Sequence, residues 1–361
     1  MLEKIKFDEQ ELEVKRVDTL YGFLPNKVYN TPISMKENFA SAVKNKEALW
    51  IPSFNDQKLF TPKVAEDNLC HGFSCEANPF NPFETPLVTD FFGVEWMFEA
   101  SCNGSIENPA NPPRLDTMEG WEKELTVPDP DKWDWEGSGE ENKGYLSDGY
   151  FNSMWQFNGL FERVRSLLGF VNALTAMIDE DEKPHIHAFL EQMTEYYKKI
   201  IRNATRVYDI DLLFFHDDWG TQRAPFMNPE TTREMIKPYL KQIVDCAHEN
   251  GLLFQMHSCG CNRGNVEIMI ECGVDIYAPQ ANANEVDKMY EDFGDQIMLG
   301  ITPEINAHAS EMEVQEFCKR FVDHFAKDFK TRPSYTEDAF FMEFPPTLRE
   351  NLYRYSREAL S

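Results

Sequence analysis

Basic residues are scarce in this sequence. Of its 361 residues, 35 are lysine or arginine and 62 are aspartate or glutamate, which gives a formal net charge of −27 at pH 7. A nucleic-acid groove, or a face that binds an anionic membrane, needs clustered lysine and arginine side chains. The charge balance therefore argues against both, and it is typical of a well-solvated surface.

Long apolar runs are also missing. No segment approaches the ~18 to 20 apolar residues of a membrane-spanning helix. The first six residues include the charged Glu3, Lys4 and Lys6 and lack the apolar segment of a secretory signal. We therefore expect a cytoplasmic protein whose eight cysteines are free thiols rather than disulfides.

The apolar content is nevertheless ample for a large core, with 42% hydrophobic residues and 28 phenylalanines. From residue 179 onward, amphipathic helical patterns alternate with short apolar strands. Helices are predicted at residues 179–206, 228–250, 265–272, 284–293 and 310–327, and strands at 211–215, 252–256, 274–278 and 296–301. Repeated strand–helix units predict a parallel sheet, and the chain length favours a (β/α)8 TIM barrel over an open sheet.

The remaining segments complete the predicted organisation. Residues 1–45 form an N-terminal arm that ends in a helix, and residues 46–361 form a single barrel domain. Residues 48–54 are the expected first strand, and the loop-rich segment 55–148 is typical of long inserted loops that cover a site.

Polar residues follow the predicted strands at corresponding positions. They are His216 to Trp219, His257 to Cys259, Pro279 with Gln280, and Thr302 to Glu304. Barrel enzymes carry their chemistry at the carboxyl ends of the strands. These clusters are therefore expected to converge on one site.

The cluster after the strand at 252–256 combines an imidazole with two thiols. If that strand continues, His257, Cys259 and Cys261 point to the same side, because side chains alternate along a strand. Imidazole and thiolate are zinc ligands, and a catalytic zinc needs three protein ligands and one open position. The third ligand stays open among five candidates. They are Cys261, Glu304, Glu95, Cys102 and Asp218.

Three segments carry a family resemblance: residues 214–222 (FFHDDWGTQ), 226–230 (FMNPE) and 257–260 (HSCG). Together they resemble the uroporphyrinogen decarboxylase superfamily, in its branch of cobalamin-dependent methyltransferases. The resemblance covers roughly residues 90–325 and is strongest to the methyltransferase components of anaerobic O-demethylase systems. It implies a zinc-bearing barrel that moves a methyl group from a methoxylated compound to a separate corrinoid protein. The aromatic residues Trp96, Phe98 and Trp219 favour an aromatic donor.

Two features depart from the superfamily's patterns. The decarboxylases hold their acidic substrate with an arginine-rich N-terminal motif, whereas this chain has no arginine between Arg16 and Arg114. Decarboxylation of a substrate with many carboxylates is therefore disfavoured. Related methyltransferases also add a cysteine after the last strands, where this chain has only Cys318 within a helical pattern.

The positions of other residues near the predicted zinc site suggest what they do there. Asp217 and Asp218 are expected to orient His257 or to donate a proton. Trp96, Phe98 and Trp219 would form aromatic walls, while Gln222 and Gln280 would line the pocket. His216 is interpreted as a structural residue at the strand end.

Other candidates are interpreted as structural. Arg163 could pair with a substrate anion, but an ion pair on a helix surface is the preferred interpretation. Cys70 and Cys75, with His71 between them, have the wrong spacing for a zinc knuckle. The cysteines on helical patterns are expected in the core: Cys246, Cys272 and Cys318.

Two alternative functions stay open: a decarboxylase of the same fold, and a non-catalytic protein that binds a small molecule. The methyl donor is also open among phenyl methyl ethers, methylamines, methyl thiols and methanol-like compounds. So are the oligomeric state, which includes a homo-oligomer, and the ability of free cobalamin to replace the corrinoid partner.

Overall fold

A strongly curled parallel sheet forms the centre of the protein. The computed structural model describes residues 2–20, 24–70, 75–79, 87–99, 104–338 and 342–360. In them the sheet has seven strands in the order β12-β11-β10-β9-β8-β7-β3. The strands are β3 (Gln57–Phe60), β7 (Phe151–Gln156), β8 (Leu212–His216), β9 (Leu253–Ser258), β10 (Ile276–Pro279), β11 (Met298–Ile301) and β12 (Ser334–Thr336).

The two edges of this sheet approach each other. Ser53, four residues before β3, forms a parallel bridge with Thr336 of β12, and the Thr336 N–H donates to the Pro52 carbonyl at 2.7 Å. The predicted α/β class is confirmed as a TIM-barrel-like fold. The described part of the chain contributes seven strands to it rather than the eight expected.

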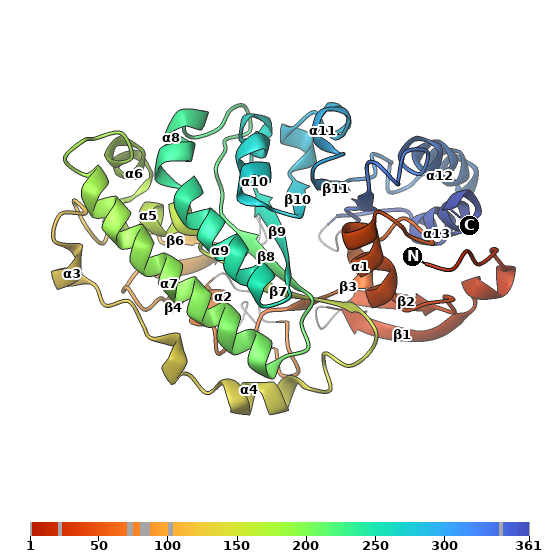
Figure 1. The fold of residues 1–361 in the computed structure, drawn as a ribbon, viewed down its shortest axis with the longest axis horizontal. Coiled ribbons are helices and arrows are strands. Elements are labelled where there is room, and N and C mark those ends of the chain that lie inside the picture. The colour runs from red at the N-terminus through yellow and green to blue at the C-terminus, as the bar shows by residue number, and fades with distance from the viewer. Residues whose placement is uncertain are drawn as a thin grey trace.

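Helices cover the outside of the sheet. Figure 1 shows α7, α9 and α10 side by side on one flank, while α12 and α13 lie at the other end of the molecule near both termini. From β7 onward the helices are α5 (Leu160–Leu168), α6 (Phe170–Ala176), α7 (Lys183–Val207), α8 (Pro229–Met235), α9 (Lys237–Glu249), α10 (Val266–Cys272), α11 (Val286–Phe293), α12 (Glu311–Phe325) and α13 (Leu348–Leu360). Before β7 they are α1 (Met35–Asn45), α2 (Glu66–Cys70), α3 (Trp121–Glu124) and α4 (Trp135–Asn142).

The predicted helix over residues 228–250 is divided in two. Its start is confirmed, because the Asn228 side chain accepts a hydrogen bond from the Thr231 N–H at 2.8 Å. The division falls at Ile236, two residues before Pro238. Proline lacks an N–H and restricts the residue before it, so the helix ends and restarts there.

The segment predicted as the first strand has no regular strand structure. After Pro52, the Ser53 side chain and the Asp56 carboxylate satisfy each other's backbone N–H groups in a short 3-10 turn, Phe54–Asp56. Local hydrogen bonds from serine and aspartate side chains compete with sheet formation in this way. The prediction was therefore wrong for residues 48–54, and the edge strand is β3 instead.

The N-terminal arm contains a hairpin that was not predicted and ends, as predicted, in a helix, α1. Strands β1 (Val14–Leu20) and β2 (Leu24–Tyr29) pair antiparallel. Just before them, the Glu11 carboxylate accepts from Arg357 of α13, with Nε to Oε2 at 2.7 Å. Both side chains are buried, so this ion pair attaches the arm to the C-terminal helix.

A small antiparallel sheet is built from the loop-rich region: β4 (Leu87–Thr89), β5 (Glu95–Glu99) and β6 (Gly104–Glu107). The cysteines at seven described positions are free thiols, as expected. Within the described ranges, the helices are too short or too polar to cross a bilayer.

Candidate metal centre

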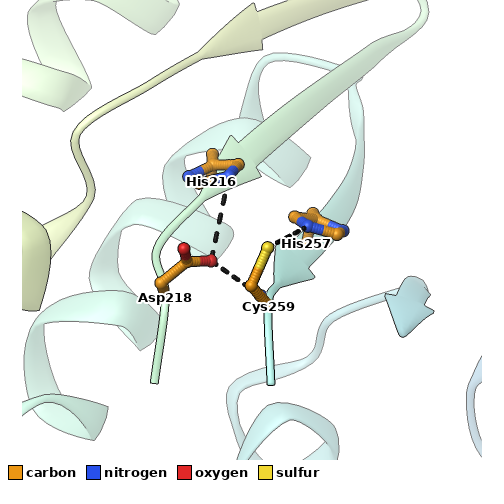
Figure 2. Close-up of side chains that lie close together, drawn as sticks. All are labelled: His216, Asp218, His257 and Cys259. Atoms are coloured by element: carbon orange, nitrogen blue, oxygen red, sulfur yellow. Dashed lines mark hydrogen bonds and ion pairs between the residues drawn. The ribbon is translucent and has the colours of Figure 1, made fainter. Parts of the chain in front are cut away.

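Four potential metal ligands converge where β8 and β9 end. The two strands are neighbours with His216 opposite His257, and each is followed by a second ligand type, Asp218 and Cys259. One ligand atom from each of these four side chains lies within 4.8 Å of all the others. Figure 2 shows the four side chains turned toward one another from the two strand ends.

The ring of His257 is held in one orientation. Its Nδ1 lies 2.9 Å from the carbonyl oxygen of Ala278, which can only accept a hydrogen bond. Nδ1 therefore carries the hydrogen, and the lone pair of Nε2 faces the Cys259 sulfur at 3.3 Å. Histidines that bind metals are oriented by this kind of bond to the other ring nitrogen.

His216 is held in the same manner by a carboxylate. Its Nδ1 lies 3.1 Å from Glu162 Oε2, and its Nε2 lies 3.8 Å from Asp218 Oδ1. Burial alone would lower the pKa of His216, but the carboxylates of Glu162 and Asp218 raise it well above its usual value. The interpretation of His216 as a structural residue missed its place among the four.

The Cys259 thiol is suited to ionise. Burial acts to raise its pKa, but the imidazoles of His257 and His216 outweigh this effect and lower the pKa. The thiolate is the form that binds metal. The backbone N–H of Cys259 donates to Asp218 Oδ1 at 2.6 Å, so Asp218 also fixes the chain that presents the sulfur.

Gly260 redirects the chain directly after Cys259. Its φ is +82°, and a Cβ added there would lie 2.0 Å from the Gly220 carbonyl oxygen, so only glycine fits. Strand β9 has already ended at Ser258, and the Cys261 N–H donates to the Thr221 carbonyl at 2.7 Å. The alternation expected through Cys261 is therefore wrong, and Cys261 lies outside the four-residue group.

The other candidates for a third ligand also lie elsewhere. Glu95 accepts hydrogen bonds from Asn108 and Asn111 near β6, and Glu304 is exposed after β11. Neither belongs to the described four-residue group. Cys102 falls outside the described residues. Asp218 is the one of these candidates that the fold brings to His257 and Cys259.

Asp217 serves the fold rather than the group. Its carboxylate is fully buried and accepts from the N–H groups of Phe161 and Glu162 at 3.1 and 2.9 Å, at the start of α5. Trp219 Nε1 adds a third bond at 2.8 Å. Burial, with Glu162 nearby, raises the pKa of Asp217 to about 7. The predicted catalytic Asp217 is thus placed as a cap of α5.

The predicted aromatic walls are largely in the interior. Trp96 and Trp219 are each 1% exposed, and the Trp96 indole donates to Asp90 Oδ2 at 3.0 Å. Phe98 is partly buried on β5. The two indoles therefore offer little surface for the aromatic walls predicted from the sequence.

The two predicted pocket glutamines lie beside the turn that follows Cys259. Gln222 Nε2 donates to Gln280 Oε1 at 3.0 Å, and the same oxygen accepts from the Gly260 N–H at 2.7 Å. They join the loops after β8 and β10 across the end of β9. Their predicted contact with a substrate stays a prediction.

Arg163 is buried, contrary to the interpretation of a surface ion pair. It is 0% exposed, with Nη1 2.7 Å from Asp90 Oδ2 and Nη2 bonded to Asp67. The cysteines expected in the core, Cys246, Cys272 and Cys318, are all buried. So are Cys70 and Cys75, where burial raises the pKa of Cys75 to about 12; His71 lies outside the described residues.

Removal of the carboxylate behind His216 is expected to weaken metal binding. Glu162→Ala should reduce zinc affinity by about 10- to 100-fold, since His216 loses the bond that fixes its ring. Glu162→Gln, which keeps an acceptor oxygen, should lose less. Competition with a chromophoric zinc chelator measures both values, and equal affinities for Glu162→Ala and wild type would contradict the orienting role.

The donor set fits zinc. Two imidazoles with oriented rings, a thiol with a lowered pKa and a carboxylate are the ligand types that zinc takes. His216, His257 and Cys259 could hold the ion with Asp218 at the fourth position. A donor oxygen that took the place of Asp218 would occupy the open position that a catalytic zinc requires.

Comparison with known proteins identifies the fold. No family model matches the sequence, and no curated protein does. A solved methyltransferase from Methanosarcina mazei is similar with a TM-score of 0.60 and 11% identity, over 90% of this chain and 98% of that one. A sugar phosphate isomerase/epimerase from Parabacteroides distasonis matches with 10% identity and a TM-score of 0.35, over 62% of this chain and 75% of that one. The similarity to the methyltransferase shows a TIM-barrel-like fold.

Proposed function

We propose that this protein is a zinc-dependent methyltransferase that moves a methyl group from a methoxylated, aromatic compound to a corrinoid protein. The observation that carries the proposal is the group of His216, Asp218, His257 and Cys259, with both rings oriented from behind. It lies at the carboxyl ends of neighbouring strands, where barrel enzymes carry their chemistry. The fold's similarity to a solved methyltransferase supports the same assignment.

The chemistry of the donor explains why such a group is needed. An ether oxygen is a poor leaving group, and the negative charge that develops on it must be stabilised. When bound, zinc supplies a Lewis acid for that oxygen. The protein's own contribution is to hold two imidazoles and one thiol with a lowered pKa at fixed positions at the ends of β8 and β9.

Direct measurement of methyl transfer tests the proposal. The zinc-loaded protein, mixed with reduced corrinoid protein and a panel of methoxyarenes, should convert the corrinoid spectrum to that of the methylated form. Cys259→Ala should abolish the conversion. Free reduced cobalamin, added in place of the corrinoid protein, shows whether the partner is required.

Two results would contradict the proposal. If neither the corrinoid protein nor free cobalamin is methylated by any donor, the transferase assignment is wrong. Release of carbon dioxide from a tetrapyrrole carboxylate would favour the decarboxylase instead. Ligand binding without turnover, and without zinc, would favour a non-catalytic binding protein.

A further inference from the structure

A second polar group faces the interior of the barrel from the far edge of the sheet. Glu337 directly follows β12, two residues after Tyr335, and both are buried. The Tyr335 hydroxyl donates to Glu337 Oε2 and accepts from Gln255 Nε2 at 3.0 Å. Gln255, Tyr335 and Glu337 therefore form one hydrogen-bonded chain.

This chain crosses the interior of the barrel. Gln255 belongs to β9, and two other strands, β10 and β11, separate β9 from β12 in the sheet. A direct bond between Gln255 and Tyr335 is thus a bond across the curved sheet. Gln255 lies two residues before His257, so the two side chains share the inner face of β9. Glu337 consequently faces the interior into which His257 also points.

Strands β10 and β11, which lie between β9 and β12, carry small residues beside His257 and Tyr335. Ala278 is paired with His257, and Gly300 is paired with Tyr335. A Cβ at Gly300 would lie 2.7 Å from the Tyr335 hydroxyl and 2.8 Å from Glu337 Oε2. Glycine at position 300 therefore gives Tyr335 and Glu337 the space that a side chain would fill.

The surroundings of Glu337 keep it able to hold a proton at neutral pH. Burial raises the pKa of Glu337 to about 7, with the Asp338 carboxylate acting in the same direction, while the Tyr335 hydroxyl and the His257 ring act to lower it. Because Tyr335 donates to Oε2, the proton belongs on Oε1. Glu337 lies outside the four-residue metal group.

The two aspartates expected to supply a proton are already engaged. Asp217 accepts three hydrogen bonds at the start of α5. Asp218 accepts the Cys259 N–H and is itself a candidate ligand. Glu337 neither caps a helix nor belongs to the described metal group.

We propose that Glu337 is the general acid of the reaction, protonating the oxygen that leaves the methyl group, and that Tyr335 is its positioning residue. This role rests on the proposed methyltransferase function. The C–O bond of the ether breaks and its electron pair stays on oxygen. The methyl carbon bonds to a reduced cobalt corrinoid, which contributes both electrons of the new bond. The oxygen takes the proton of Glu337 Oε1, which leaves an alcohol or phenol and a carboxylate that accepts from Tyr335.

A series of leaving groups distinguishes this role from a structural one. Glu337→Gln keeps the size and hydrogen-bonding capacity of the side chain but has no proton to transfer. Its rate should fall by about 10²- to 10⁴-fold with unactivated ethers, and far less with nitro-substituted anisoles, whose phenolate leaves without protonation. Tyr335→Phe should give a smaller loss with the same dependence on the leaving group. Glu343→Gln, an exposed carboxylate in the same segment, is the matched control and should behave as wild type.

A measurement independent of turnover examines the acid itself. The buried Asp217 also has a pKa raised to about 7, so the infrared spectrum of Glu337→Gln is subtracted from that of the wild type to cancel its C=O band. The difference should contain the C=O band of the protonated Glu337, which disappears as the pH rises through about 7. Subtraction of the Glu343→Gln spectrum should leave no such band. The absence of the band from the difference between wild type and Glu337→Gln would overturn the proposal.

Other outcomes separate the two proposals. A rate loss in Glu337→Gln that is equal for all leaving groups, or a loss of its zinc, would overturn the general-acid role while the methyltransferase function stands. A wild type that methylates no corrinoid from any donor contradicts the proposed function, and the role of Glu337 falls with it.

Discussion

Cys259→Ala protein is expected to lose its zinc on gel filtration, whereas the wild type keeps about one zinc per chain. The sulfur is the only soft ligand among the four described candidates, and its lowered pKa makes thiolate available near neutral pH. Substitution of a residue that only orients a ligand reduces metal affinity by up to roughly 100-fold. Loss of a direct ligand should reduce zinc affinity by at least as much. Plasma emission spectrometry of the purified proteins gives the metal content.

Cys261→Ala is the matched control, because it removes a thiol two residues away that lies outside the group. It should retain the zinc of the wild type. Equal zinc loss in both variants would show that the turn at Gly260, rather than the Cys259 sulfur, is what the metal site requires. A wild type without zinc would contradict the metal centre altogether.

Arg163→Ala is expected to lower the free energy of unfolding by about 3–5 kcal/mol. The guanidinium is fully buried between Asp67 and Asp90, and it also stacks 4.9 Å from the centre of the Phe91 ring. Burial already raises the pKa of Asp67 despite the attraction of Arg163. Without the cation, two buried carboxylates face each other uncompensated.

Urea denaturation followed by fluorescence measures this loss. Arg206→Ala removes an exposed partner of Glu136 and should change the stability by less than about 1 kcal/mol. Similar losses for the two variants would mean that the buried ion pairs contribute no more than exposed ones.

The class of fold follows from the order of patterns along the chain. Short, continuous apolar strands alternated with amphipathic helices, and such units bury both faces of a parallel sheet only in a few architectures. A local feature whose partner lies within a few residues was also predictable: Asn228 caps α8 by accepting from the Thr231 N–H.

The four residues of the metal group could be identified only from contacts between strands. His216 enters it because β8 and β9 pair with His216 opposite His257, a register that the sequence leaves open. Cys261 leaves it because β9 stops at Ser258, so the alternation of side chains does not reach that thiol. Glu162 lies in the first turn of α5, and Glu337 directly follows β12. Both are placed by contacts with segments far away in the chain.

The same reason accounts for the buried Arg163. Its helical pattern suggests a surface position, and its two carboxylate partners come from segments 96 and 73 residues earlier. The spacing of apolar residues, two in a strand and 3.6 in a helix, shows only which face of that one element is buried. Ion pairs, metal ligands and proton donors depend on which elements meet, and that is fixed when the sheet curls and its strand ends converge.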